Sequence, residues 1–165
     1  MKQLILMRHA KSDWSSGSMS DHDRPLNPRG AAAAKMLGDW LRTHNISPDQ
    51  VLCSSAKRTA QTYLGLGLSQ DIPITFTRDL YLATHTEMLT ALQGATDDVV
   101  LMLGHNPGIS ITAAELLSSP LEHPKFEQYP TGATLVADFQ IDDWRDADWG
   151  KAIARHFVVP RDLSL

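Results

Sequence analysis

Short, unbroken apolar runs alternate along the chain with segments whose apolar residues recur every three or four positions. Residues 4–7 and 99–103 contain only apolar side chains. Runs of this length are typical of strands that are buried on both faces of a parallel sheet. Weaker patterns predict further strands over residues 50–53, 74–77, 134–139 and 154–159.

Helical segments separate the predicted strands. In the first, Asn27 suits the N-cap and Pro28 the first helical position, and an apolar stripe follows at Ala33, Leu37, Trp40 and Leu41. Further helices are predicted over residues 56–66, 85–92 and 109–117; Ser54 or Ser55 should cap the first of them, and Asn106 the last, with Pro107 opening it. This alternation predicts an α/β fold, a three-layer sandwich with a mostly parallel central sheet and helices on both faces, in a single domain spanning residues 1–165.

The composition is that of an ordinary globular chain. Of its 165 residues, 42% are hydrophobic and 21% are charged, and no window is apolar enough to span a bilayer. We therefore expect no membrane partner, and no secretory signal, because a single Lys2 precedes only a short apolar run. The single cysteine, Cys53, lies in an apolar run, so we expect a core residue in a protein of the reducing cytoplasm.

Charge is distributed unevenly along the chain. The formal net charge is −4, which argues against a nucleic-acid partner. Residues 1–58 contain 9 Lys/Arg and 5 Asp/Glu, a balance of +4, whereas residues 59–165 contain 6 and 14, a balance of −8. This asymmetry suggests a local anion site within an acidic protein. Random scatter of charge over a solvated surface would give the same totals.

Basic and imidazole side chains follow three of the predicted strands. Arg8 and His9 come directly after the first apolar run, His105 follows the second, and Arg58 falls in the first turn of the helix after the strand between them. Because the carboxyl ends of parallel strands meet at one edge of a sheet, we expect these side chains to converge. Each alone also has a purely structural interpretation, as a strand cap or an exposed cation.

This set of side chains is suited to phosphoryl transfer. Two arginines can neutralise a phosphoryl group and stabilise the charge on its oxygens. A neutral imidazole can attack phosphorus and carry the group covalently, and His9 beside Arg8 is placed for that role. Nearby arginines would favour the neutral form of an imidazole whose ordinary pKa is about 6.5. His105 would donate a hydrogen bond or positive charge to a non-bridging oxygen.

Several motifs, in order, resemble the histidine phosphatase superfamily, and most of all its SixA-type phosphohistidine phosphatase branch. The matching segments are RHAKSDW at 8–14, DRPLNPRG at 23–30, SSAKRTAQT at 54–62, LY at 80–81, LGHNPG at 103–108 and PRDL at 160–163. The resemblance implies a phosphoglycerate mutase-like fold, His9 as the phosphorylated nucleophile, and a phosphate pocket of Arg8, Arg58 and His105. We expect neither a metal nor a cofactor.

One position departs from the family's pattern. Many relatives carry a glutamate as general acid just after the LY segment, where this chain has Leu82. The acids that could act in its place, or form a substrate rim, are Asp13, Asp21, Asp23 and Glu87, which the sequence does not rank. Arg24 either reaches the phosphate or braces the preceding loop through Asp21 or Asp23.

The missing glutamate bears on the substrate. Its loss suits a leaving group that needs little protonation, such as the imidazole of a phosphohistidine, and the short chain has no long insertion to enclose a small metabolite. The expected partner is therefore a phosphohistidine-carrying protein, with a small phosphoester as the alternative.

Other functions remain open at this stage. One is a small-molecule phosphomonoesterase or mutase of the same fold, and another is a non-catalytic phosphate-binding regulatory module. A metal-dependent hydrolase using His9, His105 and Asp13 is disfavoured, because two arginines would repel the metal ion and no compact ligand motif is present.

Overall fold

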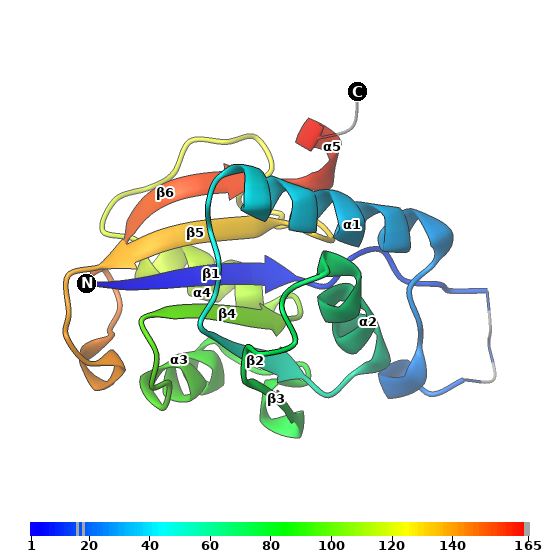
Figure 1. Ribbon diagram of the computed structural model, residues 1–165, viewed down its shortest axis with the longest axis horizontal. Helices are drawn as coiled ribbons and strands as arrows, with labels where there is room; N and C mark the ends of the chain where they lie inside the picture. The colour runs from blue at the N-terminus through cyan, green and yellow to red at the C-terminus, as the bar shows by residue number, and fades with distance from the viewer. Residues whose placement is uncertain (16, 18, 164–165) are drawn as a thin grey trace.

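The computed structural model describes residues 1–15, 17 and 19–163 and contains a six-stranded mixed sheet (Figure 1). The strand order is β3–β2–β4–β1–β5–β6. Strands β1 to β4 run parallel, β5 runs antiparallel to β1, and β6 runs antiparallel to β5. The strands are β1 (Lys2–Arg8), β2 (Gln50–Ser54), β3 (Ile74–Thr77), β4 (Val99–Gly104), β5 (Thr134–Phe139) and β6 (Ile153–Val158).

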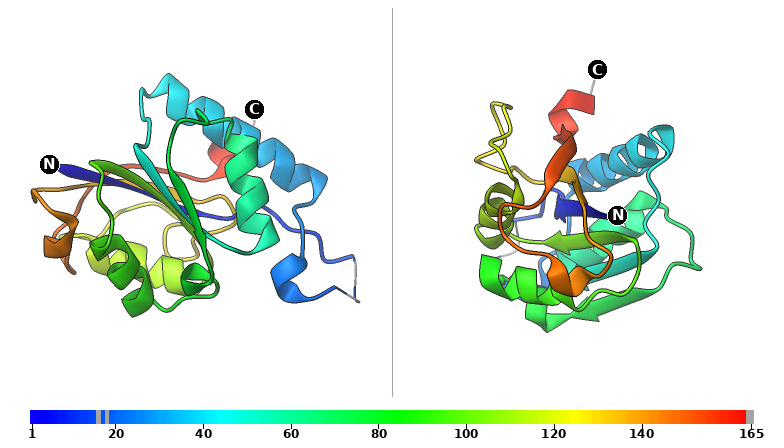
Figure 2. Two further views of the ribbon diagram at one scale, coloured as in Figure 1. Left: turned by 60° about the horizontal axis from the view of Figure 1, so that its bottom comes forward. Right: turned by 90° about the vertical axis from the view of Figure 1, so that its left-hand side faces the viewer.

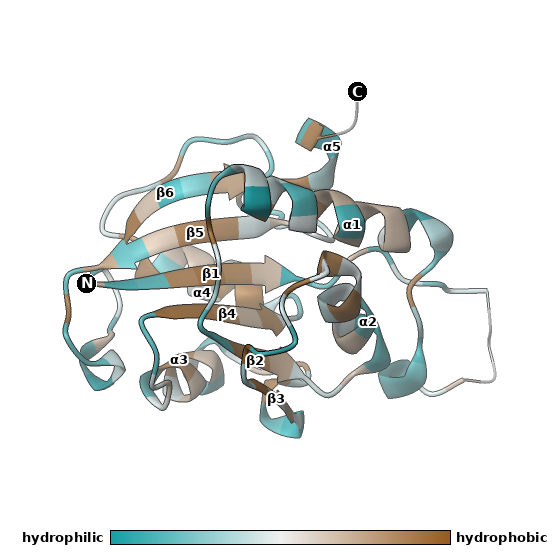
Figure 3. Ribbon diagram, viewed as in Figure 1, coloured by the Kyte–Doolittle hydropathy of each residue, from teal (hydrophilic) through white to brown (hydrophobic). Residues whose placement is uncertain are grey.

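Helices cover both faces of the sheet (Figures 1 and 2). They are α1 (Pro28–Thr43), α2 (Lys57–Leu66), α3 (His85–Gln93), α4 (Gly108–Leu116) and the short α5 (Pro160–Leu163). Apolar residues of α1 and α2 pack in one cluster with one face, and those of α3 and α4 pack in a second cluster with the other. Figure 3 shows the hydrophobic residues concentrated on the central strands between these layers. The predicted three-layer α/β fold is confirmed.

The unbroken apolar runs form the centre of the sheet, as predicted. Leu4 to Met7 in β1 and Val100 to Leu103 in β4 are at most 1% exposed, and the two strands pair in register from Gln3↔Val99 to Arg8↔Gly104. Burial of these apolar side chains is the main contribution to stability here. Cys53 is buried in the core, and burial raises the pKa of its thiol to about 12.

The predicted start of α1 is confirmed, whereas the predicted cap of α2 is wrong. The side chain of Asn27 accepts a hydrogen bond from the backbone N–H of Gly30, and Pro28 is the first residue of α1. The N-cap of α2 is Ala56, without a capping side chain. The Ser54 hydroxyl accepts from the N–H of Ala56 itself and contacts His105, and the Ser55 hydroxyl contacts His22, so neither serine bonds an amide of the first turn.

The predicted cap of α4 is also wrong. Its N-cap is Pro107, and the helix begins one residue earlier than expected. The Asn106–Pro107 peptide bond is cis. The Asn106 amide donates to the backbone carbonyls of Gln128 and Tyr129, so it ties α4 to the loop before β5 instead of capping the helix. Among the described residues, no helix has the length and apolar character required to cross a membrane.

Candidate active site

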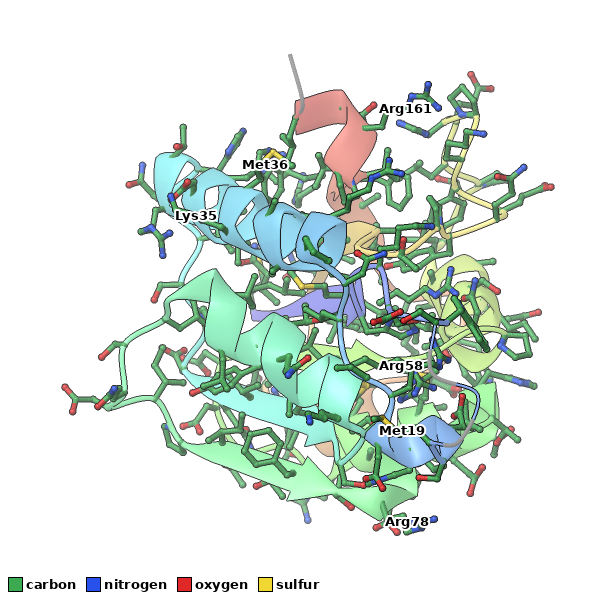
Figure 4. All side chains as sticks on the ribbon, turned by 90° about the vertical axis from the view of Figure 1, so that its right-hand side faces the viewer. Met19, Lys35, Met36, Arg58, Arg78 and Arg161 are labelled. Atoms are coloured by element: carbon green, nitrogen blue, oxygen red, sulfur yellow. The ribbon has the colours of Figure 1, made fainter. Side chains whose placement is uncertain are left out.

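The carboxyl edge of the parallel strands brings Arg8, His9, Arg58 and His105 together. Arg8 pairs with Gly104 at the ends of β1 and β4, so His9 and His105 leave neighbouring strands side by side, with ring centroids 5.3 Å apart. Arg58, in the first turn of α2, is 2% exposed. Figure 4 looks onto this edge of the sheet and labels Arg58. The side chains that the sequence predicted to converge therefore share one site.

A backbone hydrogen bond fixes the tautomer of His9. Its Nδ1 lies 2.7 Å from the carbonyl oxygen of Ala10. Because a carbonyl oxygen only accepts, Nδ1 carries the proton and the lone pair is on Nε2. Burial, together with the positive charges of Arg8 and Arg58, lowers the pKa of His9 to about 3. The ring is therefore neutral at physiological pH, as a nucleophile must be.

A serine on the neighbouring strand orients His105. Its Nε2 lies 2.8 Å from the hydroxyl oxygen of Ser54, whereas its Nδ1 is buried without a partner. Burial and the nearby His9 and Arg58 lower the pKa of His105 to about 3. An anion bound between the two imidazoles would favour the protonated form. His105 can therefore become a charged donor to an anion bound beside it.

Buried polar atoms without partners, most of them donor nitrogens, gather at this site. Among the residues that the structure describes, the buried side-chain atoms without a hydrogen-bond partner are Arg8 Nε, Arg24 Nε, Arg58 Nε, His105 Nδ1 and Asn106 Oδ1. A buried polar group left unpaired costs about 1–3 kcal/mol, and natural proteins contain few of them. A cluster dominated by guanidinium and imidazole nitrogens is expected where an anion with several acceptor oxygens binds.

Asp21 enters the site from the loop that follows β1. Its carboxylate accepts hydrogen bonds from Nη2 of Arg58 and Nη2 of Arg24, both at 3.0 Å, and from the hydroxyl of Tyr81. Its backbone carbonyl accepts from Nη1 of Arg58 at 2.7 Å. The Tyr81 hydroxyl and the two arginines hold the pKa of Asp21 well below its usual range. Asp21 therefore remains ionised and holds Arg58 in place.

The other acids named from the sequence are engaged elsewhere. The Asp13 carboxylate accepts from the backbone N–H of Ser15, and that of Asp23 accepts from the hydroxyl of Ser20. The Glu87 carboxylate belongs to the capping box that starts α3. In the part of the chain that the structure describes, these three carboxylates make no hydrogen bond or ion pair with the convergent side chains, which are Arg8, His9, Arg58 and His105.

Arg24 braces the loop. Its guanidinium donates to the carboxylate of Asp21 and to the hydroxyl of Ser12, and it lies 3.6 Å from the centroid of the Trp14 ring. The sequence leaves open whether Arg24 braces the loop or reaches the phosphate, and these contacts are those of a brace. Within the described residues, no group of three or more His, Cys, Asp or Glu side chains is arranged to hold a metal ion.

Sequence reasoning missed two supporting residues. Ser54 was one of two serines expected to cap a helix, and its hydroxyl contacts His105. Tyr81 was noted only as part of a motif, and its hydroxyl contacts Asp21, 60 residues away. Neither contact has a local sequence signal, because the first depends on the pairing of β2 with β4 and the second joins the segments that follow β1 and β3.

Comparison with known proteins agrees with this arrangement. The family model for the histidine phosphatase superfamily (branch 1) matches residues 4–81. An uncharacterised protein of Mycobacterium tuberculosis is 36% identical over 162 residues, which cover 94% of this chain and 100% of that protein. The phosphohistidine phosphatase SixA of Escherichia coli is 28% identical over 122 residues, covering 69% of this chain and 73% of that protein.

The fold matches at the level of solved structures as well. A protein of Nakamurella multipartitia, proposed to be the phosphohistidine phosphatase SixA, is 30% identical and superposes with a TM-score of 0.85, with 96% of each chain covered. Sequence and structure thus agree over nearly the whole chain. The chain belongs to the histidine phosphatase superfamily and is a hydrolase.

Proposed function

We propose that this phosphatase removes the phosphoryl group from a phosphohistidine on another protein, through a phosphoenzyme intermediate on His9. One observation carries the proposal: a buried neutral imidazole lies among the unpartnered nitrogens of Arg8, Arg58 and His105. Two guanidinium groups and an imidazole provide the donors that a phosphoryl group in transfer requires.

The reaction consists of two displacements at phosphorus. In the first, Nε2 of His9 attacks, the P–N bond to the substrate histidine breaks, and the leaving imidazole takes a proton from solvent. In the second, water attacks the phosphoryl group on His9, the electron pair of that P–N bond returns to Nε2, and orthophosphate leaves. In both steps Arg8, Arg58 and His105 stabilise the charge on the non-bridging oxygens.

The state of Asp21 favours phosphohistidine as the substrate. A carboxylate held ionised by Arg58 and Tyr81 is poorly suited to protonate an alkoxide, and Leu82 stands where many relatives carry a glutamate. An imidazole leaves without such an acid. This chemistry disfavours sugar and glycerate phosphates, whose alkoxides need protonation.

Exposed apolar side chains on the same side of the molecule favour a protein-borne substrate. Trp14 is 77% exposed and covers Arg24, and Leu82 is 52% exposed. Met19 is 43% exposed and is labelled on the same face as Arg58 in Figure 4. Tryptophan and methionine are enriched in protein interfaces. A small polar phosphoester would leave these apolar side chains exposed to water, whereas a bound protein surface can bury them.

Detection of the phosphoenzyme tests the proposal. After brief exposure to a phosphohistidine peptide, intact-mass spectrometry should show one acid-labile phosphoryl group on the wild type. The His9→Asn variant, with its fold checked by circular dichroism, should show none. Turnover should survive dialysis against a chelator.

Substrate comparison separates the alternatives. A higher kcat/KM for 3-phosphoglycerate than for the phosphohistidine peptide would replace the protein substrate with a small phosphoester. A wild type that binds vanadate but hydrolyses neither compound, nor p-nitrophenyl phosphate, would instead indicate a phosphate-binding regulatory module.

A further inference from the structure

Two adjoining cavities open between the start of α1, α5 and the loop before β5. Each has a volume of about 540 Å³, and both are lined by Thr131, Pro160 and Arg161. Figure 4 shows Arg161 on the face that carries the catalytic edge, beside α1 and α5. The cations that line the two cavities, together called the basic groove here, are Lys11, Arg29, Lys125 and Arg161.

The basic groove begins next to the candidate nucleophile. Lys11 follows His9 by two residues, which places their Cα atoms within about 7 Å. Gly132, adjacent to Thr131, donates its N–H to the carbonyl of His9 at 2.9 Å. A Cβ at Gly30 would lie 2.0 Å from the carbonyl oxygen of Lys11, so only glycine lets the first turn of α1 pack this closely. A protein bound at His9 can therefore extend directly into the groove.

Three of the groove cations, Lys11, Arg29 and Lys125, lie outside the ion pairs that several cations elsewhere on the molecule form. The cations paired with an aspartate at 2.6–3.6 Å away from the site are Lys2, Lys35, Arg42, Arg145 and Arg155. Within the described residues, no carboxylate lies at ion-pair distance from Lys11, Arg29 or Lys125. Among the lining residues Asp162 is the one acid, and it contacts His123. The groove is thus a positive strip on a protein whose net charge is −4.

We propose that the basic groove docks an acidic segment of the protein that carries the phosphohistidine, an inference that rests on the proposed function. Each cavity alone has the size of a small-ligand site, so the two together accommodate an extended segment. Cations gathered along a groove of an otherwise acidic protein attract an acidic partner and fix its register. Nucleic acid fits less well, because residues 59–165 carry a balance of −8 that repels a long polyanion.

Two synthetic phosphohistidine peptides of equal length test this docking, one with four flanking aspartates and one with four flanking asparagines. At about 20 mM NaCl we expect a kcat/KM about tenfold higher for the acidic peptide, and near equality at about 300 mM, because salt screens exposed charges. The Arg29→Glu/Lys125→Glu double variant should lose the preference while its kcat/KM for p-nitrophenyl phosphate stays within about threefold of wild type.

A matched control keeps the overall charge change the same. Arg145→Glu/Lys151→Glu reverses two exposed cations that do not line the groove, and it should retain the preference for the acidic peptide. Equal kcat/KM for the two peptides on the wild type would overturn the docking proposal and leave the proposed function standing, as would equal loss in both double variants. If neither peptide is hydrolysed while p-nitrophenyl phosphate is, the phosphohistidine function itself fails, and the docking proposal fails with it.

Discussion

Polar groups are paired at one end of the central sheet, whereas several are left without partners at the other end. At the amino ends of the parallel strands, Lys2 pairs with Asp98 at 2.6 Å, and the Trp144 indole donates to the carbonyl of Asp97 at 2.6 Å. The side-chain oxygen of Gln50 accepts from the backbone N–H groups of Thr96 and Asp97, in the turn before β4. At the carboxyl ends, by contrast, arginine and histidine nitrogens are buried without partners.

The same parallel strands run from one end to the other. The difference in polar pairing therefore comes from the side chains that precede the strands and those that follow them. Matched donors and acceptors at the amino ends hold the turns and contribute to stability. Unmatched donors at the carboxyl ends are destabilising until an anion binds, and they then stabilise the anion strongly. Substitutions at the two ends should therefore separate activity from stability.

The largest expected effect is that of Arg58→Ala at the carboxyl end. Loss of the buried guanidinium that is proposed to bind the phosphoryl group should lower kcat/KM about 10³-fold for the phosphohistidine peptide. Arg58→Lys should recover little of this loss, because an ammonium group cannot donate in the bidentate geometry. Steady-state kinetics measures both effects. Activity within tenfold of wild type in Arg58→Ala would remove Arg58 from the phosphate pocket.

The two buried histidines should make stability depend on pH. Both have a folded pKa of about 3, below the ordinary 6.5, so the unfolded state binds more protons between these values. Their contribution to stability is fully present above pH 6.5 and is lost as the pH falls toward 3. The loss approaches about 1.4 kcal/mol per pH unit for each histidine.

Urea unfolding at several pH values between 7 and 4 checks this expectation. His9→Asn/His105→Asn should give a flatter dependence than the wild type. The lowered pKa of His156 acts equally in both proteins and cancels. Parallel curves would contradict the burial of neutral imidazoles at the site.

Most of this site could be predicted because its main residues follow buried strands directly. His9 and His105 come within two residues of unbroken apolar runs, and parallel pairing of those runs places them side by side. Asp21 could not be ranked, since it reaches Arg58 across 37 residues through a polar loop without apolar periodicity. The cap predicted at Asn106 failed for a similar reason: its amide is used by a loop 22 residues later.

Asp21→Asn has a smaller expected effect. It tests whether Asp21 donates a proton in the reaction or only positions Arg24 and Arg58. The asparagine keeps an acceptor for Arg58 but removes a negative charge beside the phosphate pocket. We expect kcat for the phosphohistidine peptide within about tenfold of wild type and a Ki for orthophosphate about tenfold lower. A kcat loss of 100-fold or more, with unchanged Ki, would make Asp21 the proton donor instead.

The smallest effect is expected at the amino end, from Asp98→Asn. Its side chain is 73% exposed, and its ion pair with Lys2 is of the surface kind that contributes little. We expect a Tm shift of less than about 2 °C and kcat/KM equal to that of wild type. Differential scanning fluorimetry and the peptide assay measure the two quantities. If Asp98→Asn lowered kcat/KM while Tm stayed constant, the two ends of the sheet would be coupled, and their separation into a stabilising end and a catalytic end would no longer hold.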